Sequence, residues 1–188
     1  MEQELTHASA KIVGRIDKKV HDVSELRESV DGWDELTHSE KRIASRTVDP
    51  VHEETVYNVT TDRFHEYLVD NLDPGQTGTG SNLTAAYLAL GDDSASGTAT
   101  TDTDLNNRLY SEEVTDHADN GKDLLCSTFI DSTEANGNSY EELGLFTGDP
   151  ANLANSDVFM INHTTFSAVT KDNSKTVTFD VTLTFSDA

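Results

Sequence analysis

The sequence predicts a mainly β fold with a helical N-terminal part, an α+β arrangement in which an antiparallel β-sandwich or small barrel follows a helical arm. Near the start of the chain, apolar residues recur every three or four positions, whereas in the second half they alternate with polar residues. No helical pattern separates the alternating segments, which favours antiparallel pairing. We therefore divide the chain into residues 1–56, an arm and linker for attachment or oligomerisation, and residues 57–188, a capping helix and an antiparallel β domain.

The predicted arm is a narrow apolar stripe between residues 5 and 36. Side chains at this spacing lie along one line of a helix, while its other faces carry charged residues. A stripe this narrow favours a helix that lies on a partner or in a coiled coil over one that is buried in its own domain. The residues expected to contact a partner are Ile12, Ile16, Val20, Val23, Leu26, Val30 and Trp33.

A linker and a second helix are expected next. Pro50 disfavours helical conformation at the residue before it, so residues 45–58 are interpreted as a linker. Thr60 or Thr61 can cap the following helix, which Pro74 ends.

Alternation then predicts six strands. The last is the clearest, because threonine and aspartate alternate with apolar residues from position 176 to position 185. One face of this strand is expected to be buried and the other to face water or a sister subunit. The predicted strands cover residues 85–90, 109–114, 123–130, 140–146, 158–166 and 171–185.

The charge balance limits the classes of partner. The chain has 35 acidic and 13 basic residues, for a net charge of -22, which argues against binding to nucleic acid. No segment has the roughly 20 apolar residues of a membrane span, so no membrane is expected as a partner. Molar salt screens such self-repulsion, and the composition therefore predicts a protein of a salt-loaded cytoplasm that loses stability when salt is lowered.

Two adjacent carboxylates, Glu141 and Glu142, raise the possibility of a hydrolase. Neighbouring residues of a strand point to opposite faces, so the two carboxylates are expected to diverge rather than to face one substrate. We interpret this stretch as structural, with Glu142 accepting hydrogen bonds, and we predict no enzyme activity. The motif consists of Glu142, Leu143, Gly144, Leu145 and Phe146.

One segment has the spacing of a calcium-binding loop. Asp102, Asp104, Asn106 and Glu113 stand at positions one, three, five and twelve, although position six is asparagine rather than glycine. The seven histidines show no HxH or HExxH spacing and are expected at the surface or at interfaces. The sequence therefore predicts no cofactor and no metal centre, with calcium binding by this loop left as an alternative.

Taken in order, the motifs resemble the small β domain of tail-fibre, tail-collar and baseplate proteins of tailed viruses. Residues 88–91 match a strand that ends in ALG, residues 142–146 match an EIGLF turn with Leu143 for isoleucine, and residues 176–185 match an alternating closing strand. The likeness spans residues 57–188 and departs from the family in the loop, where Arg108 precedes the acidic pair. The resemblance implies a virion structural protein without catalytic residues that forms homo-oligomers, commonly trimers, with other virion structural proteins as partners.

Together with the acidic composition, the resemblance predicts a structural protein of a haloarchaeal tailed virus, made in the host cytoplasm and located in the virion. Its expected place is the tail or baseplate, or a tail-fibre adaptor, with assembly through the helical arm and the β domain. Two alternatives stay open at this point. One is a turret or decoration protein mounted on the capsid, and the other is a calcium-dependent module that binds the host surface.

Overall fold

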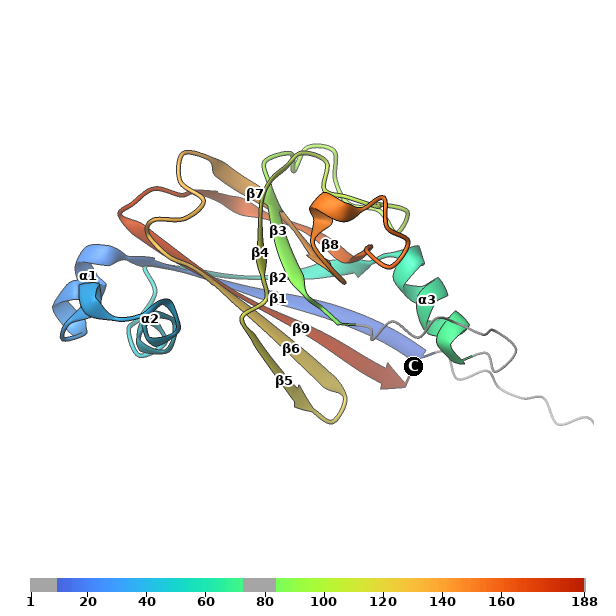
Figure 1. Cartoon of the computed structure of the whole chain (residues 1–188), viewed down its shortest axis with the longest axis horizontal. Coiled ribbons are helices and arrows are strands. Elements are labelled where there is room, and N and C mark those ends of the chain that lie inside the picture. Colours follow the sequence, from blue (N-terminus) through green and yellow to red (C-terminus); the bar gives the residue numbers. More distant parts are fainter. Residues whose placement is uncertain (1–9, 73–83, 188) are drawn as a thin grey trace, which may run out of the picture.

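The largest element of the described chain is an antiparallel sheet of nine strands. The computed structural model describes residues 10–72 and 84–187, and the strand order within them is β4-β3-β7-β8-β2-β1-β9-β6-β5 (Figure 1). The strands are β1 (Ala10–Asp22), β2 (His52–Thr60), β3 (Tyr87–Gly91), β4 (Arg108–Glu113), β5 (Asp116–Asn120), β6 (Asp123–Ile130), β7 (Ser139–Phe146), β8 (Met160–Thr170) and β9 (Lys175–Asp187). This confirms the predicted mainly β, antiparallel class.

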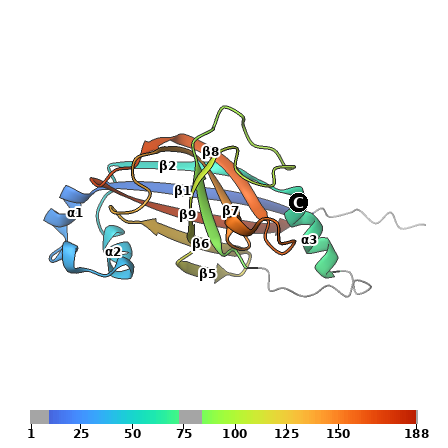
Figure 2. The ribbon, with the colours of Figure 1, turned by 45° about the horizontal axis from the view of Figure 1, so that its top comes forward.

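Short helices lie at the two ends of the sheet. Figures 1 and 2 show α1 and α2 together at one end and α3 at the other. In the described part of the chain, no helix has the length and apolar character needed to cross a membrane. Within residues 10–72 and 84–187 the helices are α1 (Val23–Ser29), α2 (His38–Ser45) and α3 (Asp62–Leu72), together with two 3₁₀ turns, η1 (Trp33–Glu35) and η2 (Pro150–Asn152).

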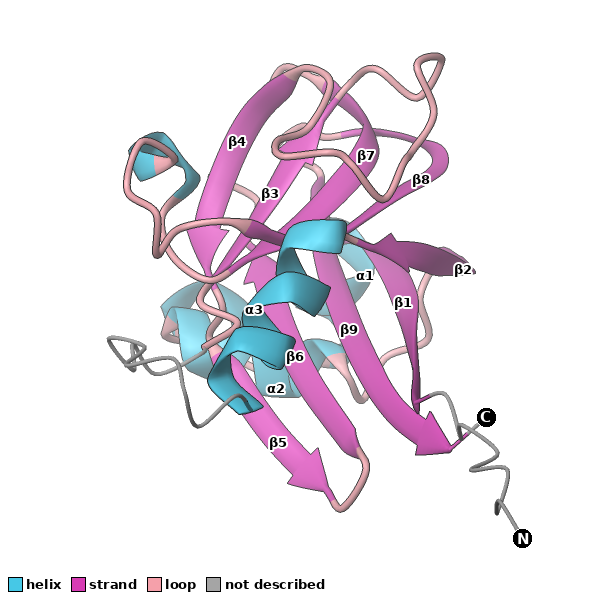
Figure 3. Cartoon of the chain, turned by 90° about the vertical axis from the view of Figure 1, so that its right-hand side faces the viewer, coloured by secondary structure: helices cyan, strands magenta, loops and turns pink. Residues whose placement is uncertain are grey.

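The sheet curls because one stretch of chain crosses between its halves. Strands β4 and β5 are the two edges, yet only Val114 and Thr115 separate them in sequence. The N–H of Val114 donates to Ala86 before β3 at 2.8 Å, and that of Thr115 donates to Ser127 of β6 at 3.1 Å. The sheet therefore forms a curled half-barrel, whose crossing strands are visible in Figure 3.

The main core lies between the two halves of the curled sheet. Strand β2 connects the halves on the other side, since residues 52–58 pair with β1 and residues 59–60 pair with β8. Both halves contribute fully or nearly fully buried aliphatic and aromatic side chains, which supply the apolar burial that stabilises the fold. They include Ile16, Val20, Val177, Phe179, Val181 and Leu183 from one half and Leu88, Leu90, Leu143, Leu145, Ile161 and Phe166 from the other.

The predicted helical arm is wrong for residues 10–22, which form β1. This strand pairs with β2 on one side and β9 on the other, in the middle of the sheet. A spacing of four residues fits one face of a helix, but it also fits one face of a strand, whose period is two. Gly14 and Lys18 occupy the positions between Ile12, Ile16 and Val20 and hide the alternation.

Lys18 points into the interior because its charge is fully paired. Its side chain is 1% exposed, and Nζ lies 2.6 Å from the Glu54 carboxylate and donates to the Ser167 carbonyl at 2.6 Å. The ammonium also sits 4.6 Å from the centroid of the Phe166 ring. A buried charge with these contacts is tolerated in a core-facing position. Reasoning from the sequence pattern alone would place a charged residue such as Lys18 at the surface.

The seven stripe residues pack within this chain. Ile16 and Val20 belong to the main core. A second cluster with Phe129, on the outer face of β6 under α1 and η1, contains Val23, Leu26 and Trp33. Ile12 and Val30 are partly buried against these clusters, so the predicted continuous helical stripe is not formed.

The proposed division at residues 56 and 57 falls inside β2, and β1 shares one sheet with the later strands. The segment interpreted as a linker, residues 45–58, begins at the last residue of α2 and contains most of β2. The threonine-bearing face of β9 is only partly exposed to solvent, because Thr176 and Thr178 are buried on the side of the sheet that carries Phe129. The chain's own N-terminal helices cover that side.

Candidate functional site

The Glu142 carboxylate is the centre of a buried polar network. Its side chain is 0% exposed, and it accepts the backbone N–H groups of Asn106 at 3.1 Å and Asn107 at 2.9 Å. Glu142 pairs across β3 and β7 with Gly91, where an added Cβ would lie 2.3 Å from Oε1. The missing side chain at Gly91 therefore makes the space that this carboxylate fills.

His163 joins Glu142 to a second carboxylate. Its Nε2 lies 2.9 Å from Glu142 Oε2 and its Nδ1 lies 2.7 Å from Asp102 Oδ2, with the ring itself 0% exposed. Both ring nitrogens therefore face carboxylate oxygens, and an imidazole that carries a proton on each nitrogen would donate to both. We call Asp102, His163 and Glu142 the closed triad, since every facing atom has a partner.

The closed triad holds the long loop between β3 and β4 against β7 and β8. Asp102 also accepts the N–H of Ala99 at 2.7 Å, and Asn106 Nδ2 donates to the carbonyls of Asp93 and Gly97. A buried ring with both nitrogens engaged has no free site to take a proton from a bound molecule. The arrangement therefore positions a loop, with both ring nitrogens of His163 engaged by carboxylates.

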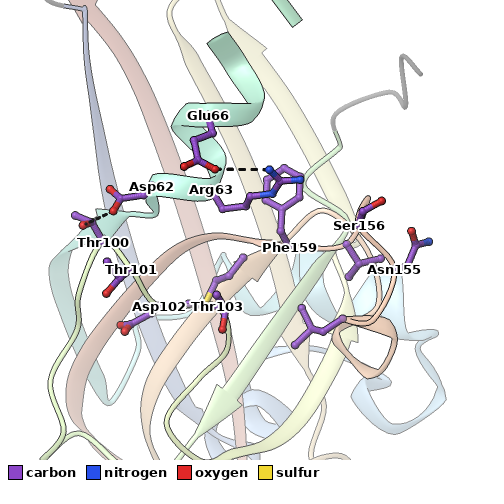
Figure 4. A pocket seen from close by; sticks show the side chains of 13 residues that line it. Asp62, Arg63, Glu66, Thr100, Thr101, Asp102, Thr103, Asn155, Ser156 and Phe159 are labelled. Carbon is purple, nitrogen blue, oxygen red and sulfur yellow. Dashed lines mark hydrogen bonds and ion pairs between the residues drawn. The ribbon is translucent and has the colours of Figure 1, made fainter. Parts of the chain in front are cut away.

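A cleft of about 530 Å³ lies beside the closed triad, between the first turn of α3, residues 100–103 and residues 153–160 (Figure 4). Its floor is apolar, and the Arg63 guanidinium lies over the Phe159 ring at 5.7 Å. The polar groups of its rim pair with one another: Arg63 lies 3.6 Å from Glu66, and Thr100 donates to Asp62 at 3.1 Å. Asp102 belongs to this rim as well as to the closed triad.

The two adjacent glutamates diverge, as strand geometry predicts. Glu141 is half-buried and accepts a hydrogen bond from Ser94, whereas Glu142 is buried on the other face. Of the rest of the predicted motif, Leu143 and Leu145 join the main core, and Phe146 joins a smaller cluster with Leu105. An added Cβ at Gly144 would lie 2.8 Å from the Phe146 ring.

The residues at calcium-loop spacing do not converge. Asp104 pairs with Arg108 at 3.0 Å, and Glu113 accepts a hydrogen bond from the Tyr87 hydroxyl at 3.0 Å. Among the described residues, the acidic members of the set do not form a group whose oxygens could hold one ion. The full set is Asp102, Asp104, Asn106 and Glu113.

Sequence reasoning missed the roles of His163 and Asp102. His163 lies between Asn162 and Thr164 in β8, and only the pairing of β7 with β8, in which it faces Gly144, brings it beside Glu142. The two motif fragments ALG and ELGLF were the available signal, since Gly91 of the first makes room for Glu142 of the second. Comparisons of the chain with protein-family models, with curated proteins and with solved structures gave no match.

Proposed function

We propose that this chain is a structural protein of the virion of a haloarchaeal tailed virus, acting in the tail or baseplate or as a tail-fibre adaptor. The observation that carries the proposal is the contact between its two motif fragments. Gly91 closes the ALG fragment and Glu142 opens the ELGLF fragment, and the two residues are paired neighbours in the sheet. The features that resemble the viral domain thus belong to one structural device.

The chemistry of the device supports a role without catalysis. Glu142 and His163, the buried ionisable groups of the motif region, bind the loop backbone and each other. Such a use of charge fixes a loop on a sheet, which suits a protein whose function is to present a surface in an assembly. A hydrolase would instead need one of these groups to face a bound substrate.

We propose copies of this chain, in a trimer, and other virion proteins as its partners. Since β1 lies inside the sheet, the contacts with partners are assigned to the sheet edges β4 and β5 and to the open side of β2 rather than to a helical arm. The open side of β2 is the side of residues 52–58 that faces away from β1. On or next to β2, Tyr57 is 71% and Val51 47% exposed, which are large values for apolar side chains. The net charge of -22 favours protein partners over nucleic acid.

Antibody labelling of intact virions tests the proposal directly. Label on the tail or baseplate is expected, whereas label on the head would replace it with the capsid-mounted alternative. Production of the protein in infected cells without any label on virions would contradict both.

Light scattering of the full chain in molar KCl tests the oligomer. A mass three times that of the chain is expected, and Tyr57→Lys should lower it because it adds a charge on the open side of β2. Asn173→Lys, in the exposed turn between β8 and β9, is the matched control and should leave the mass unchanged. A monomer at all concentrations would contradict self-assembly.

A further inference from the structure

A second group of ionisable side chains lies where α2 meets the β sheet. His38 comes from the first turn of α2, Glu112 from the edge strand β4, and Glu134 from the loop that follows β6. Their nearest ligand atoms, one imidazole nitrogen and two carboxylate oxygens, all lie within 4.8 Å of one another. We call these three residues the open cluster.

The imidazole of the open cluster has an unused nitrogen. His38 Nε2 is shielded from solvent and has no hydrogen-bond partner among the described residues, although it lies 3.4 Å from Glu134 Oε2. The ring is held by an edge contact with Phe129, at 5.2 Å between centroids. A shielded nitrogen without a donor or acceptor is costly, and it points to a ligand that would bind there.

Outer contacts orient all three side chains. The Tyr110 hydroxyl donates to Glu112 Oε2 at 2.7 Å, and the N–H of Asp131 donates to Glu134 Oε2 at 2.7 Å. The first turn of α2 is fixed by a capping box, in which Thr37 and Glu40 bond reciprocally. Partners of this kind normally hold metal ligands in position.

The electrostatics of the open cluster favour a bound cation. The carboxylate groups of Glu112 and Glu134 each place an oxygen within 4.8 Å of the other. Two carboxylates this close repel each other unless a positive charge lies between them. The partly exposed side chains of His38 (34%) and Glu134 (33%) leave a path for an ion to enter.

We propose that His38, Glu112 and Glu134 bind one divalent transition-metal ion of the zinc class. An imidazole nitrogen with two carboxylate oxygens suits Zn²⁺ or Co²⁺, whereas Ca²⁺ and Mg²⁺ prefer oxygen alone. Three protein ligands leave one position for water or for a group from a neighbouring molecule. The ion would tie α2, β4 and the loop after β6 together, three segments that are distant in sequence.

The test is a calorimetric titration of the metal-free full chain with ZnCl₂ in molar KCl and an excess of Mg²⁺, which occupies the many surface carboxylates. One Zn²⁺ per chain and a higher melting temperature are expected. His38→Gln and Glu134→Gln should each weaken binding by more than about tenfold. Two matched controls should leave it unchanged: Glu113→Gln, which neighbours Glu112 on the same strand, and His52→Gln, an exposed histidine of β2.

Three results would overturn the proposal: no binding of Zn²⁺, displacement of Zn²⁺ by Mg²⁺, or equal affinity in His38→Gln and the unchanged chain. Circular dichroism shows whether each variant folds. If the cluster variants fail to fold, Co²⁺ absorption of the unchanged chain decides. Visible bands of a low-symmetry site with nitrogen ligation are expected, and the spectrum of hexaaquo cobalt would refute the site.

Discussion

The closed triad and the open cluster each place one imidazole beside two carboxylates, yet their structures differ. Both nitrogens of the fully buried His163 ring face a carboxylate, and backbone N–H groups complete the contacts. In the open cluster, Nε2 of His38 has no hydrogen-bond partner among the described residues, and the two glutamates repel each other. The same three functional groups can thus hold a loop in place or leave a site for a cation. Which of the two they do depends on burial and on how many donor protons face the carboxylate oxygens.

Replacing the ring of the closed triad should have the largest effect. His163→Leu leaves Glu142 and Asp102 without their shared partner, and breaking a buried ion pair from one side costs about 3–5 kcal/mol of unfolding free energy. Urea unfolding in molar KCl measures this cost. Glu141→Gln, next to Glu142 on β7, is the control and should cost about 1 kcal/mol or less, since it alters one partly exposed hydrogen bond. Equal costs for the two variants would refute the closed triad as a structural centre.

Filling the space beside Glu142 should have an intermediate effect. An alanine Cβ at position 91 would lie 2.3 Å from Glu142 Oε1 and 2.5 Å from the Asn107 carbonyl, and overpacking of this kind costs about 1–3 kcal/mol. The unfolding free energy of Gly91→Ala measures it. The double variant Gly91→Ala with Glu142→Ala should lose less unfolding free energy than the sum of the losses in the two single variants, because the clash with the carboxylate is gone. Strict additivity would show that the two positions are not coupled.

The smallest effect, and one of opposite sign, is expected in the open cluster. Without metal, Glu112→Gln should raise the unfolding free energy by less than about 1 kcal/mol, because it removes a half-buried charge that faces Glu134. Glu142→Gln should lower the unfolding free energy instead, since it replaces an acceptor of two backbone N–H groups. Denaturant curves of both variants in chelator test the contrast, which fails if the signs agree.

The gain from Glu112→Gln should depend on pH. The pKa of Glu112 is raised in the folded chain, chiefly by burial, so its charged form is disfavoured there. Stability from the protonated group is present below the ordinary carboxyl pKa and is lost as the pH rises through the raised value. The advantage of glutamine should therefore be absent in acid and grow towards neutral pH, as urea unfolding at a series of pH values would show.

How far the sequence predicts the fold depends on what fills the inward positions of each strand. In β9, apolar residues take the inward positions from 177 to 185, and the strand was predicted within a few residues of its bounds. In β1, a glycine and the paired ammonium of Lys18 interrupt the pattern, leaving a spacing of four that fits a helix equally well. Strand β5, with the sequence DHADN, was missed because an exposed edge strand needs no apolar face.

The candidate sites were less predictable than the strands. Glu142 was expected to accept hydrogen bonds, and it does, but its donors lie in a loop far away in the sequence. His38 and Glu134 belong to segments with no regular spacing between them, so searches for HxH or HExxH patterns pass over them. Both clusters are created by strand order and by packing of α2, which long-range contacts determine.

Nitrogen-15 NMR of the histidine rings, recorded with and without Zn²⁺, tests the contrast between the two clusters most directly. The His38 signals, identified by their loss in His38→Gln, should move when Zn²⁺ binds. The His163 ring should keep two protons that exchange slowly with water and should be unaffected by the metal. Unchanged His38 signals at saturating Zn²⁺, or ring protons of His163 that exchange freely, would contradict the account.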